Sequence, residues 1–235
     1  VLSRGDVGLK LMCAAERWAQ HKGAKELSIV TSNPSARQDC ASLGYHQDDS
    51  SAWLRKFLVA IRALAQEDCL EVARVWLSGL QQTVEANPSS ADWIGKMADE
   101  AVTEEGSLGP DGSNLFRNWS RRDRCFFVAE FRAQVIGCCG VKGGTDSQAE
   151  EMESCQVCSV WKVSVDATMR RSGVGQLLME AAEAWALKAG ATEMKLVTGN
   201  PIARDFYCKR MGYAKLGNSP WLSKMLSNER HAHVQ

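Results

Sequence analysis

The sequence has no excess of either charge, no long apolar run and no regularly spaced set of metal ligands. Its 235 residues include 28 Lys and Arg and 28 Asp and Glu, so the formal net charge is zero. A protein that binds nucleic acid broadly carries a surplus of positive charge, and a helix that spans a membrane needs about 20 consecutive apolar residues. We therefore expect neither a nucleic-acid partner nor a membrane partner.

Signals for export and for a disulfide scaffold are missing as well. No secretory signal is present, but the chain begins with Val1 rather than Met, so we expect that further sequence, with any targeting signal, precedes it. The nine cysteines follow no regular spacing and mostly stand in apolar runs, where a thiol acts as a small hydrophobic side chain. We interpret them as reduced and predict a cytoplasmic protein. We also expect no metal, because Cys155 and Cys158 form a C-x-x-C pair without the second pair that a zinc site needs.

What the sequence does have is an internal repeat. Residues 4–37 match residues 171–204 at nineteen positions without a gap. Both copies predict a helix, Gly-Ala, a short apolar strand, Asn-Pro and a second helix that ends in Gly-Tyr. The early copy carries Asp6 where the late copy carries Gly173, and it has no tyrosine that corresponds to Tyr207. Self-similarity of this length indicates a duplicated unit.

The rest of the chain alternates predicted strands and helices. Apolar runs predict strands at 57–63, 125–131, 134–141, 155–165 and 219–226. Helical spacing predicts helices over 66–82 and 90–105, and glycine, proline and asparagine predict a loop over 107–114. From about residue 57 the predicted order is therefore β-α-α-β-β-β-α-β-α, followed by a last strand.

One stretch of the late copy has the features of an anion-binding site. A strand is predicted to end near Val165 and a helix to begin near Gly173. A helix N-terminus presents free N–H groups and the positive end of the helix dipole. Gly173 and Gly175 let a ligand approach the backbone closely, and Arg170 and Arg171 add positive charge. The stretch predicts a phosphate or pyrophosphate site, although the three-glycine dinucleotide motif and the Gly-Lys-Ser/Thr of a P-loop are both absent.

In its order of elements this part of the chain resembles the GNAT superfamily of N-acetyltransferases. The resemblance is carried by VSV, RRSGVG, the amphipathic helix that follows, KLVTGN and PIARDFYCKRMGY, and it is most specific over 161–213. It implies an α/β (α+β) GNAT fold, with a mixed, mostly antiparallel twisted sheet, flanking helices and splayed central strands. It also implies that acetyl-CoA is the co-substrate and that the acetyl group moves to an amine.

The resemblance implies roles for individual residues. Backbone groups of Val163 and Val165 would pair with the pantetheine arm of acetyl-CoA, and Asn200 would lie near the cofactor where the strands splay apart. Main-chain N–H groups, with flanking positive charge, would hold the pyrophosphate over Arg170, Arg171, Ser172, Gly173, Val174, Gly175 and Gln176. Tyr207 would protonate the departing CoA thiolate, which suits a phenol of pKa about 10 beside a thiol of pKa about 8.5. The alternative for Tyr207 is an aromatic side chain that only packs beside Phe206.

The resemblance covers residues 57–226 and divides the chain. We predict a partial, degenerate GNAT-like half domain at 1–56, a GNAT acetyltransferase domain at 57–226 and a flexible tail at 227–235. We expect the early copy to have lost its cofactor site, because Asp6 sets a carboxylate against phosphate and, as a helix cap, takes the place of an anion. Two arrangements stay open: a homodimer, or intramolecular packing of the two GNAT-like units.

We expect an acetyl-CoA-dependent N-acetyltransferase that transfers an acetyl group to a primary amine of a small molecule or protein by direct attack. The alternatives are a non-catalytic acyl-CoA-binding or scaffold module and a pure interaction surface. The sequence names no base, since the strand at 155–165 offers no carboxylate and Lys162 carries the wrong charge. The retained Arg171–Gly175 segment and Tyr207 favour the enzyme. Acidic residues in 90–105 and 143–154 would suit a cationic amine if either segment lines the acceptor cleft.

Overall fold

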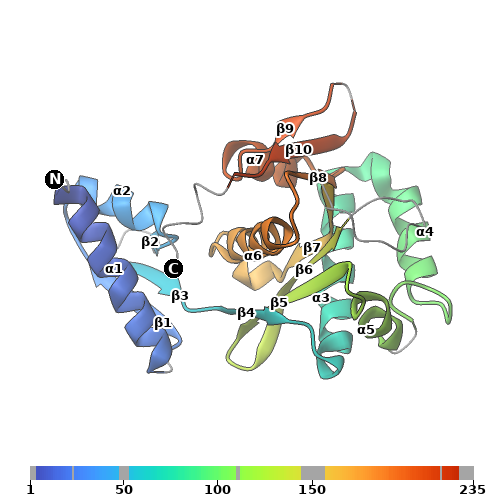
Figure 1. The fold of residues 1–235 in the computed structure, drawn as a ribbon, viewed down its shortest axis with the longest axis horizontal. Helices are drawn as coiled ribbons and strands as arrows, with labels where there is room; N and C mark the ends of the chain where they lie inside the picture. Colours follow the sequence, from blue (N-terminus) through green and yellow to red (C-terminus); the bar gives the residue numbers. More distant parts are fainter. Residues whose placement is uncertain are drawn as a thin grey trace.

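A computed structural model of the chain describes residues 4–22, 24–47, 53–109, 112–143, 157–217 and 219–227. The strands form a three-stranded sheet of order β1-β3-β2 and a seven-stranded sheet of order β4-β5-β6-β7-β8-β10-β9 (Figure 1). The strands are β1 (Glu26–Val30), β2 (His46–Gln47), β3 (Trp53–Phe57), β4 (Ala60–Ala63), β5 (Arg124–Phe131), β6 (Gln134–Gly143), β7 (Val157–Val165), β8 (Glu193–Val197), β9 (Ala214–Lys215) and β10 (Trp221–Met225). The helices are α1 (Arg4–His21), α2 (Pro34–Ser42), α3 (Cys69–Ala86), α4 (Ala91–Ala101), α5 (Ser113–Trp119), α6 (Val174–Lys188) and α7 (Pro201–Lys209), with 3-10 turns η1 (Gln66–Asp68), η2 (Pro88–Ser90) and η3 (Ala167–Met169).

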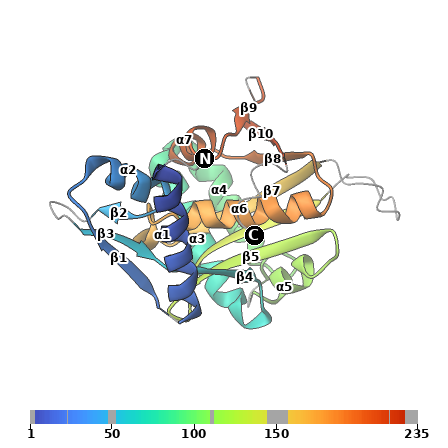
Figure 2. The same cartoon turned by 60° about the vertical axis from the view of Figure 1, so that its left-hand side comes forward.

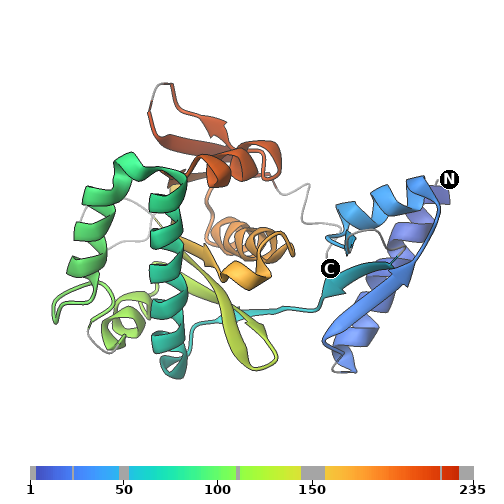
Figure 3. The same cartoon turned by 180° about the vertical axis from the view of Figure 1, so that it is seen from behind.

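Helices cover both faces of the large sheet. Helix α6 packs on β5, β6 and β7 from one side (Figure 2), and α3 packs on β6 and β7 from the other (Figure 3). Two buried clusters result, one that contains Leu178 of α6 and one that contains Val72 and Val75 of α3. All adjacent strands of this sheet are antiparallel except β7 and β8. The predicted fold class, a mixed and mostly antiparallel sheet with flanking helices, is confirmed.

The parallel strands β7 and β8 separate partway along their length. Their Cα pairing ends at Ser159 and Lys195, while β7 continues to Val165 with β6 on its other side. Among the described residues, the second half of β7 therefore has backbone groups that face no partner strand on the β8 side. This gap is the splay that the resemblance implied.

The structure departs from the predicted elements in three places. The strand expected at 57–63 is the end of β3 in the small sheet and β4 in the large one, since Leu58 and Val59 between them are both buried and keep the run apolar. The expected loop at 107–114 leads into α5, whose Leu115 is fully buried in the α3 cluster. The short strand β9 was not predicted.

The cysteines are mostly structural. Eight lie in the described residues and form no disulfide there, and Cys40, Cys69, Cys138, Cys139 and Cys158 are buried. Cys155 lies outside the described residues, so the C-x-x-C pair is not tested. The described part of the chain holds no cluster of three or more His, Cys, Asp or Glu side chains arranged to bind a metal ion. In the same part, no helix has the length and apolar character needed to cross a membrane.

The two copies of the repeat fold alike. After α1 and α6, each copy runs through strands of five, two and five residues, joined in the order β1-β3-β2 and β8-β10-β9. Their registers agree, since Val30 lies opposite Trp53 and Val197 lies opposite Trp221. Both second helices have nine residues. The sequence similarity therefore extends to topology and register.

The early copy leaves apolar side chains of its first helix exposed. Leu11 of α1 is 66% exposed, whereas Leu178, at the matching position of α6, is fully buried. Strand β8 pairs with β7, but within the described residues β1 pairs with β3 alone. In the late copy, β5, β6 and β7 pack against α6 and cover this position.

We expect residues 57–227 to fold without the segment before them. They contain the whole seven-stranded sheet, and a start at Phe57 keeps the ring contact between Phe57 and Phe131, whose centroids are 5.2 Å apart. The small sheet has a buried cluster of its own, formed by Cys40, Tyr45 and Leu54. Thermal unfolding followed by circular dichroism should give a midpoint within about 4 °C of the full chain, about 1 kcal/mol for a domain of this size. Insoluble protein, or loss of a cooperative transition, would show that the early copy is structurally required.

Candidate active site

The N-terminus of α6 is open and backbone-lined. The helix begins at Val174, and its N-cap is Gly173, with φ 83° and ψ −5°, a left-handed conformation that favours glycine. A Cβ added at Gly173 would meet no atom within 4 Å, and no side chain caps the helix. The first helical bond runs from the N–H of Leu177 to the carbonyl of Gly173 at 3.1 Å. The N–H groups of the first turn are thus left for an anion.

The turn before α6 is held by side chains that leave its backbone available. Asp166 accepts hydrogen bonds from the N–H and hydroxyl of Thr168 at 3.0 and 2.7 Å and from Arg74 at 3.0 Å. These bonds lower the pKa of the Asp166 carboxyl. The buried Ser172 donates its hydroxyl to the carbonyl of Met169. Ser172 therefore has only its main-chain N–H to offer a phosphate.

The remaining predicted residues of this segment differ in what they can contribute. Arg170 and Arg171 are exposed, and Arg171 has φ 59°, a backbone conformation rare for a residue with a side chain. The side-chain amide of Gln176 donates to Glu180 at 2.8 Å. The two arginines thus supply positive charge, and Gln176 is left to bind through its backbone.

The early copy has a different backbone at the matching positions. Helix α1 is already formed at Arg4, which corresponds to Arg171 of the late copy. Asp6 is therefore the third residue of the helix and does not stand at its N-cap position. In the described residues, the helix of the early copy thus runs through positions 4–6, which match the turn at 171–173 before α6.

Strand β7 carries a bulge beside the splay. Cys138 of β6 pairs with Ser164, and Gly140 pairs with Trp161, so two residues of β7, Lys162 and Val163, lie opposite a single residue of β6. Lys162 has φ 53°. Bulges redirect side chains and release backbone groups from the ladder. The bulge begins at Lys162, three residues beyond Ser159, the last residue of β7 that pairs with β8.

Val165 of β7, Gly175 of α6 and Phe206 of α7 lie close together at the end of this gap. A Cβ added at Gly175 would lie 3.7 Å from Val165 and 3.8 Å from Phe206. Val163 and Val165 both pack against the cluster on the α6 face. The end of β7, the start of α6 and the helix that carries Tyr207 are therefore in direct contact.

Asn200 has a structural task. It is the N-cap of α7, and its side-chain oxygen accepts the N–H groups of Ile202 and Ala203 at 2.9 and 3.3 Å. Asn33 caps α2 in the same way, with the N–H of Ser35 at 3.0 Å. Since the early copy also keeps this residue, helix capping accounts for Asn200 without a cofactor.

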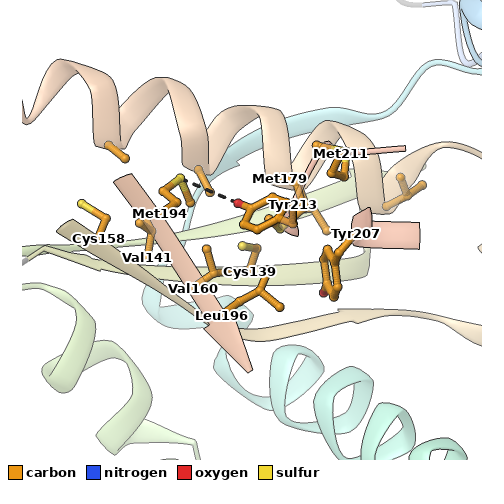
Figure 4. Packing of buried hydrophobic residues seen from close by; sticks show 14 of the residues in the cluster. Cys139, Val141, Cys158, Val160, Met179, Met194, Leu196, Tyr207, Met211 and Tyr213 are labelled. Carbon is orange, nitrogen blue, oxygen red and sulfur yellow. Dashed lines mark hydrogen bonds between the residues drawn. The ribbon is translucent and has the colours of Figure 1, made fainter. Parts of the chain in front are cut away.

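Tyr207 lies in the core of the α6 face with one end free. The residue is 6% exposed, and its ring is 5.3 Å from that of Phe206 and 5.9 Å from that of Tyr213, between centroids. Figure 4 shows its hydroxyl pointing away from Met211, while the hydroxyl of Tyr213 is directed at the sulfur of Met194. Burial raises the pKa of Tyr207 above its ordinary value, so the phenol is protonated at neutral pH.

Lys162 is a residue whose environment the sequence did not reveal. Its Nζ lies 3.3 Å from the centroid of the Trp76 ring and 3.1 Å from the hydroxyl oxygen of Ser107. Burial lowers the pKa of Lys162 to about 8. The signal in the sequence was weak, a single lysine within an apolar strand.

Comparisons with known proteins agree with this geometry. The model of the acetyltransferase (GNAT) family matches residues 94–213. An uncharacterized N-acetyltransferase of Chlorobaculum tepidum is 36% identical over 93 residues, which are 40% of this chain and 52% of that protein. The chain thus spans about half the length of the curated relative it matches.

Solved structures show the same fold. A GNAT-family acetyltransferase of Staphylococcus aureus has a TM-score of 0.51 at 14% identity, covering 72% of this chain and 99% of that one. The PaiA N-acetyltransferase of Thermoplasma acidophilum, crystallised with coenzyme A, has a TM-score of 0.51 at 18% identity, covering 71% and 98%. Together with the family match over half of its residues, this shows that the chain belongs to the GNAT acetyltransferase family.

Proposed function

We propose that the chain is an acetyl-CoA-dependent N-acetyltransferase whose site is the gap between β7 and β8 together with the N-terminus of α6. The observation that carries the proposal is the meeting of three elements there, since Gly175, Val165 and Phe206 lie within van der Waals distance once a Cβ is placed on the glycine. The Thermoplasma relative, crystallised with coenzyme A, supports the choice of co-substrate.

The residues present fit acetyl-CoA. On the side of β8, the second half of β7 has no partner strand among the described residues. There it offers main-chain groups of Val163 and Val165 to an extended amide-containing arm. The uncapped start of α6, with free space at Gly173, suits a pyrophosphate. When bound, acetyl-CoA supplies the acetyl group as a thioester. The chain's own part is to orient that thioester along β7 and to move protons.

Tyr207 has the position and protonation state of a general acid. Its phenol is buried beside the end of the gap and keeps its proton at neutral pH because burial raises its pKa. Burial at the same place would also raise the pKa of the CoA thiol. The pKa values of the Tyr207 phenol and the thiol would therefore shift in the same direction, which keeps the two groups matched for proton transfer. Tyr207 would therefore donate a proton to the departing sulfur.

Acidic side chains favour a cationic amine as the acceptor. Asp99 and Glu100 of α4 and Glu104 and Glu105 of the loop after it are all exposed. They attract a protonated amine to the side of the sheet where α3 and α4 lie. The acidic residues of 143–154 all lie outside the described residues, so that part of the prediction is not tested.

We propose that residues 1–56 are a degenerate copy of the second half of the acetyltransferase unit. Equal topology and register support a duplication, and the helix that already covers Arg4 supports the loss of its phosphate site.

A non-catalytic acyl-CoA-binding module is the second candidate, favoured by the lack of any carboxylate on β7 that could take a proton from the amine.

A thermal-shift measurement with acetyl-CoA, followed by an assay of CoA release with a panel of amines, distinguishes the enzyme from the binding module. Acetyl-CoA at 100 times its dissociation constant should stabilise the chain by about 2.7 kcal/mol, whereas acetylpantetheine, which lacks the pyrophosphate, should stabilise it far less. If the chain is an enzyme, it should also release free CoA from acetyl-CoA in the presence of at least one primary amine. Absence of any shift with acetyl-CoA rejects both candidates, and a shift without turnover on a broad panel selects the binding module.

A further inference from the structure

A partly buried lysine lies beside the splay, and the roles assigned above do not use it. Lys162 is in the β7 bulge, just beyond Ser159, where pairing with β8 ends. Contacts of its Nζ with the ring of Trp76, at 3.3 Å from the centroid, and with Ser107, at 3.1 Å, fix its side chain on the α3 face of the sheet. Tyr207 belongs to the cluster on the opposite, α6 face.

The groups around the Lys162 amine supply no opposite charge. Helix α3 contributes Trp76, the loop after α4 contributes Ser107, and β6 contributes Cys138, whose thiol donates to the Lys162 carbonyl at 3.2 Å. Burial raises the pKa of the Cys138 thiol to about 12, so it is uncharged at neutral pH. In the described parts of the chain, no carboxylate contributes to the lowered pKa of Lys162, and Glu104 and Glu105 of the same loop are exposed.

The Lys162 amine is accordingly uncharged in an appreciable fraction of molecules. With a pKa of about 8, about a tenth of the side chains is neutral at pH 7 and about half at pH 8. The objection that lysine has the wrong charge for a base then applies only to the protonated fraction. Ser107 can accept an N–H of the neutral amine and leave the nitrogen lone pair free.

We propose that Lys162 is the general base, and that its neutral Nζ takes the proton that the acceptor nitrogen loses on bonding to the acetyl carbon. The inference rests on the proposed function. The acceptor amine first releases its ammonium proton to solvent, then uses its lone pair to form the C–N bond and passes its excess proton to Nζ, so that Lys162 becomes an ammonium. The C–S bond breaks, its electron pair goes to sulfur, and Tyr207 supplies the thiol proton. Solvent then reprotonates Tyr207 and deprotonates Lys162, so the net change is amine plus thioester to amide plus thiol.

The arrangement separates the two proton transfers. The base approaches the gap from the α3 face and the acid from the α6 face. Direct attack needs this separation, because the amine adds to the acetyl carbon while the sulfur departs from it. The acidic exposed side chains of α4 and its following loop lie on the same side as the proposed base, so amines are drawn toward Lys162 rather than toward Tyr207.

Two substitutions of the full chain test the proposal. Lys162→Arg keeps a positive charge, a donor for Ser107 and the stacking on Trp76, but a guanidinium does not lose its proton. Lys162→Met removes the amine from a chain of similar length. Both variants should lose about 10²-fold in kcat/KM at pH 8, and the loss should shrink below pH 7, where the parent is protonated too. Lys188→Met, in the exposed last turn of α6, is the matched control and should keep parental activity.

A second readout does not depend on turnover. In protein labelled with 13C at the lysine ε carbons, the resonance absent from Lys162→Met should titrate with a midpoint near 8, and each variant should keep the thermal shift that acetyl-CoA gives the parent. The proposal is overturned if Lys162→Arg stays within about threefold of the parent, which would indicate a fixed charge, or if Lys162 titrates near 10. A parent that binds acetyl-CoA but acetylates no amine overturns the proposed function and the base with it. Activity that survives in Lys162→Arg overturns the base alone.

Discussion

Gly173→Asp should remove most of the stabilisation that acetyl-CoA gives the chain. The residue is the uncapped N-cap of α6, and the space at its Cβ position is empty. A carboxylate there both occupies that space and sets a negative charge against phosphate, a repulsion of about 4 kcal/mol for unit charges 4 Å apart near a protein surface. We expect at least about 10²-fold weaker binding, measured as the thermal shift of each variant against its own ligand-free midpoint.

Gly173→Asn is the matched control for this substitution. Asparagine has nearly the same shape as aspartate, and both residues tolerate the left-handed backbone at φ 83° better than most. The two variants therefore share the backbone strain and differ in charge. Gly173→Asn should keep most of the thermal shift. An undiminished shift in Gly173→Asp would place the pyrophosphate elsewhere.

The contrast with the early copy shows what the sequence could and could not predict here. Aligning Asp6 with Gly173 predicted the loss of an anion site and placed Asp6 at a helix cap, because a carboxylate near a helix start is a common cap. The backbone shows the actual difference: α1 is already helical at Arg4, while α6 begins only at Val174. Helix starts depend on the residues and contacts before them, which the aligned positions do not contain.

Strands β5, β6 and β7 of the large sheet were predictable because each presents an apolar run bounded by polar or glycine residues. The break between β3 and β4 was not, since buried Leu58 and Val59 continue the run across two different sheets. Helix α5 was missed for a related reason. Its start follows Gly112, a residue typical of loops, and its core contact through Leu115 is made with α3, distant in sequence.

Within the site, the sequence predicted positions better than environments. Main-chain roles follow from the order of strand, turn and helix, and the open N-terminus at Gly173 is where the motif placed it. The state of a side chain depends on neighbours from other elements. The sequence shows Lys162 only as a charged residue in a strand, whereas the structure shows its contacts with Trp76 and Ser107. It shows Asn200 only as a polar residue near the splay, whereas the structure shows that Asn200 caps α7.

Tyr207→Phe should lower turnover by about 10²-fold, toward the low end of what a positioned acid contributes, while binding of acetyl-CoA stays close to parental. Phenylalanine keeps the ring that packs beside Phe206 and Tyr213 and removes only the hydroxyl. The effect is at the low end because a thiolate is a fairly stable leaving group. It should diminish as the pH falls, since solvent then protonates the sulfur more readily.

Tyr213→Phe is the control that separates catalysis from packing. Both tyrosines are buried in the same cluster, and burial raises the pKa of both phenols. The hydroxyl of Tyr213, however, is directed at the sulfur of Met194 at 4.0 Å, within the core (Figure 4). Its loss should change the unfolding midpoint more than turnover. If Tyr207→Phe retains near-parental turnover on an amine that the parent acetylates, the general-acid role is excluded, and the phenol of Tyr207 serves the core in the way that Cys40, at the matching helix position, serves the smaller cluster of the early copy.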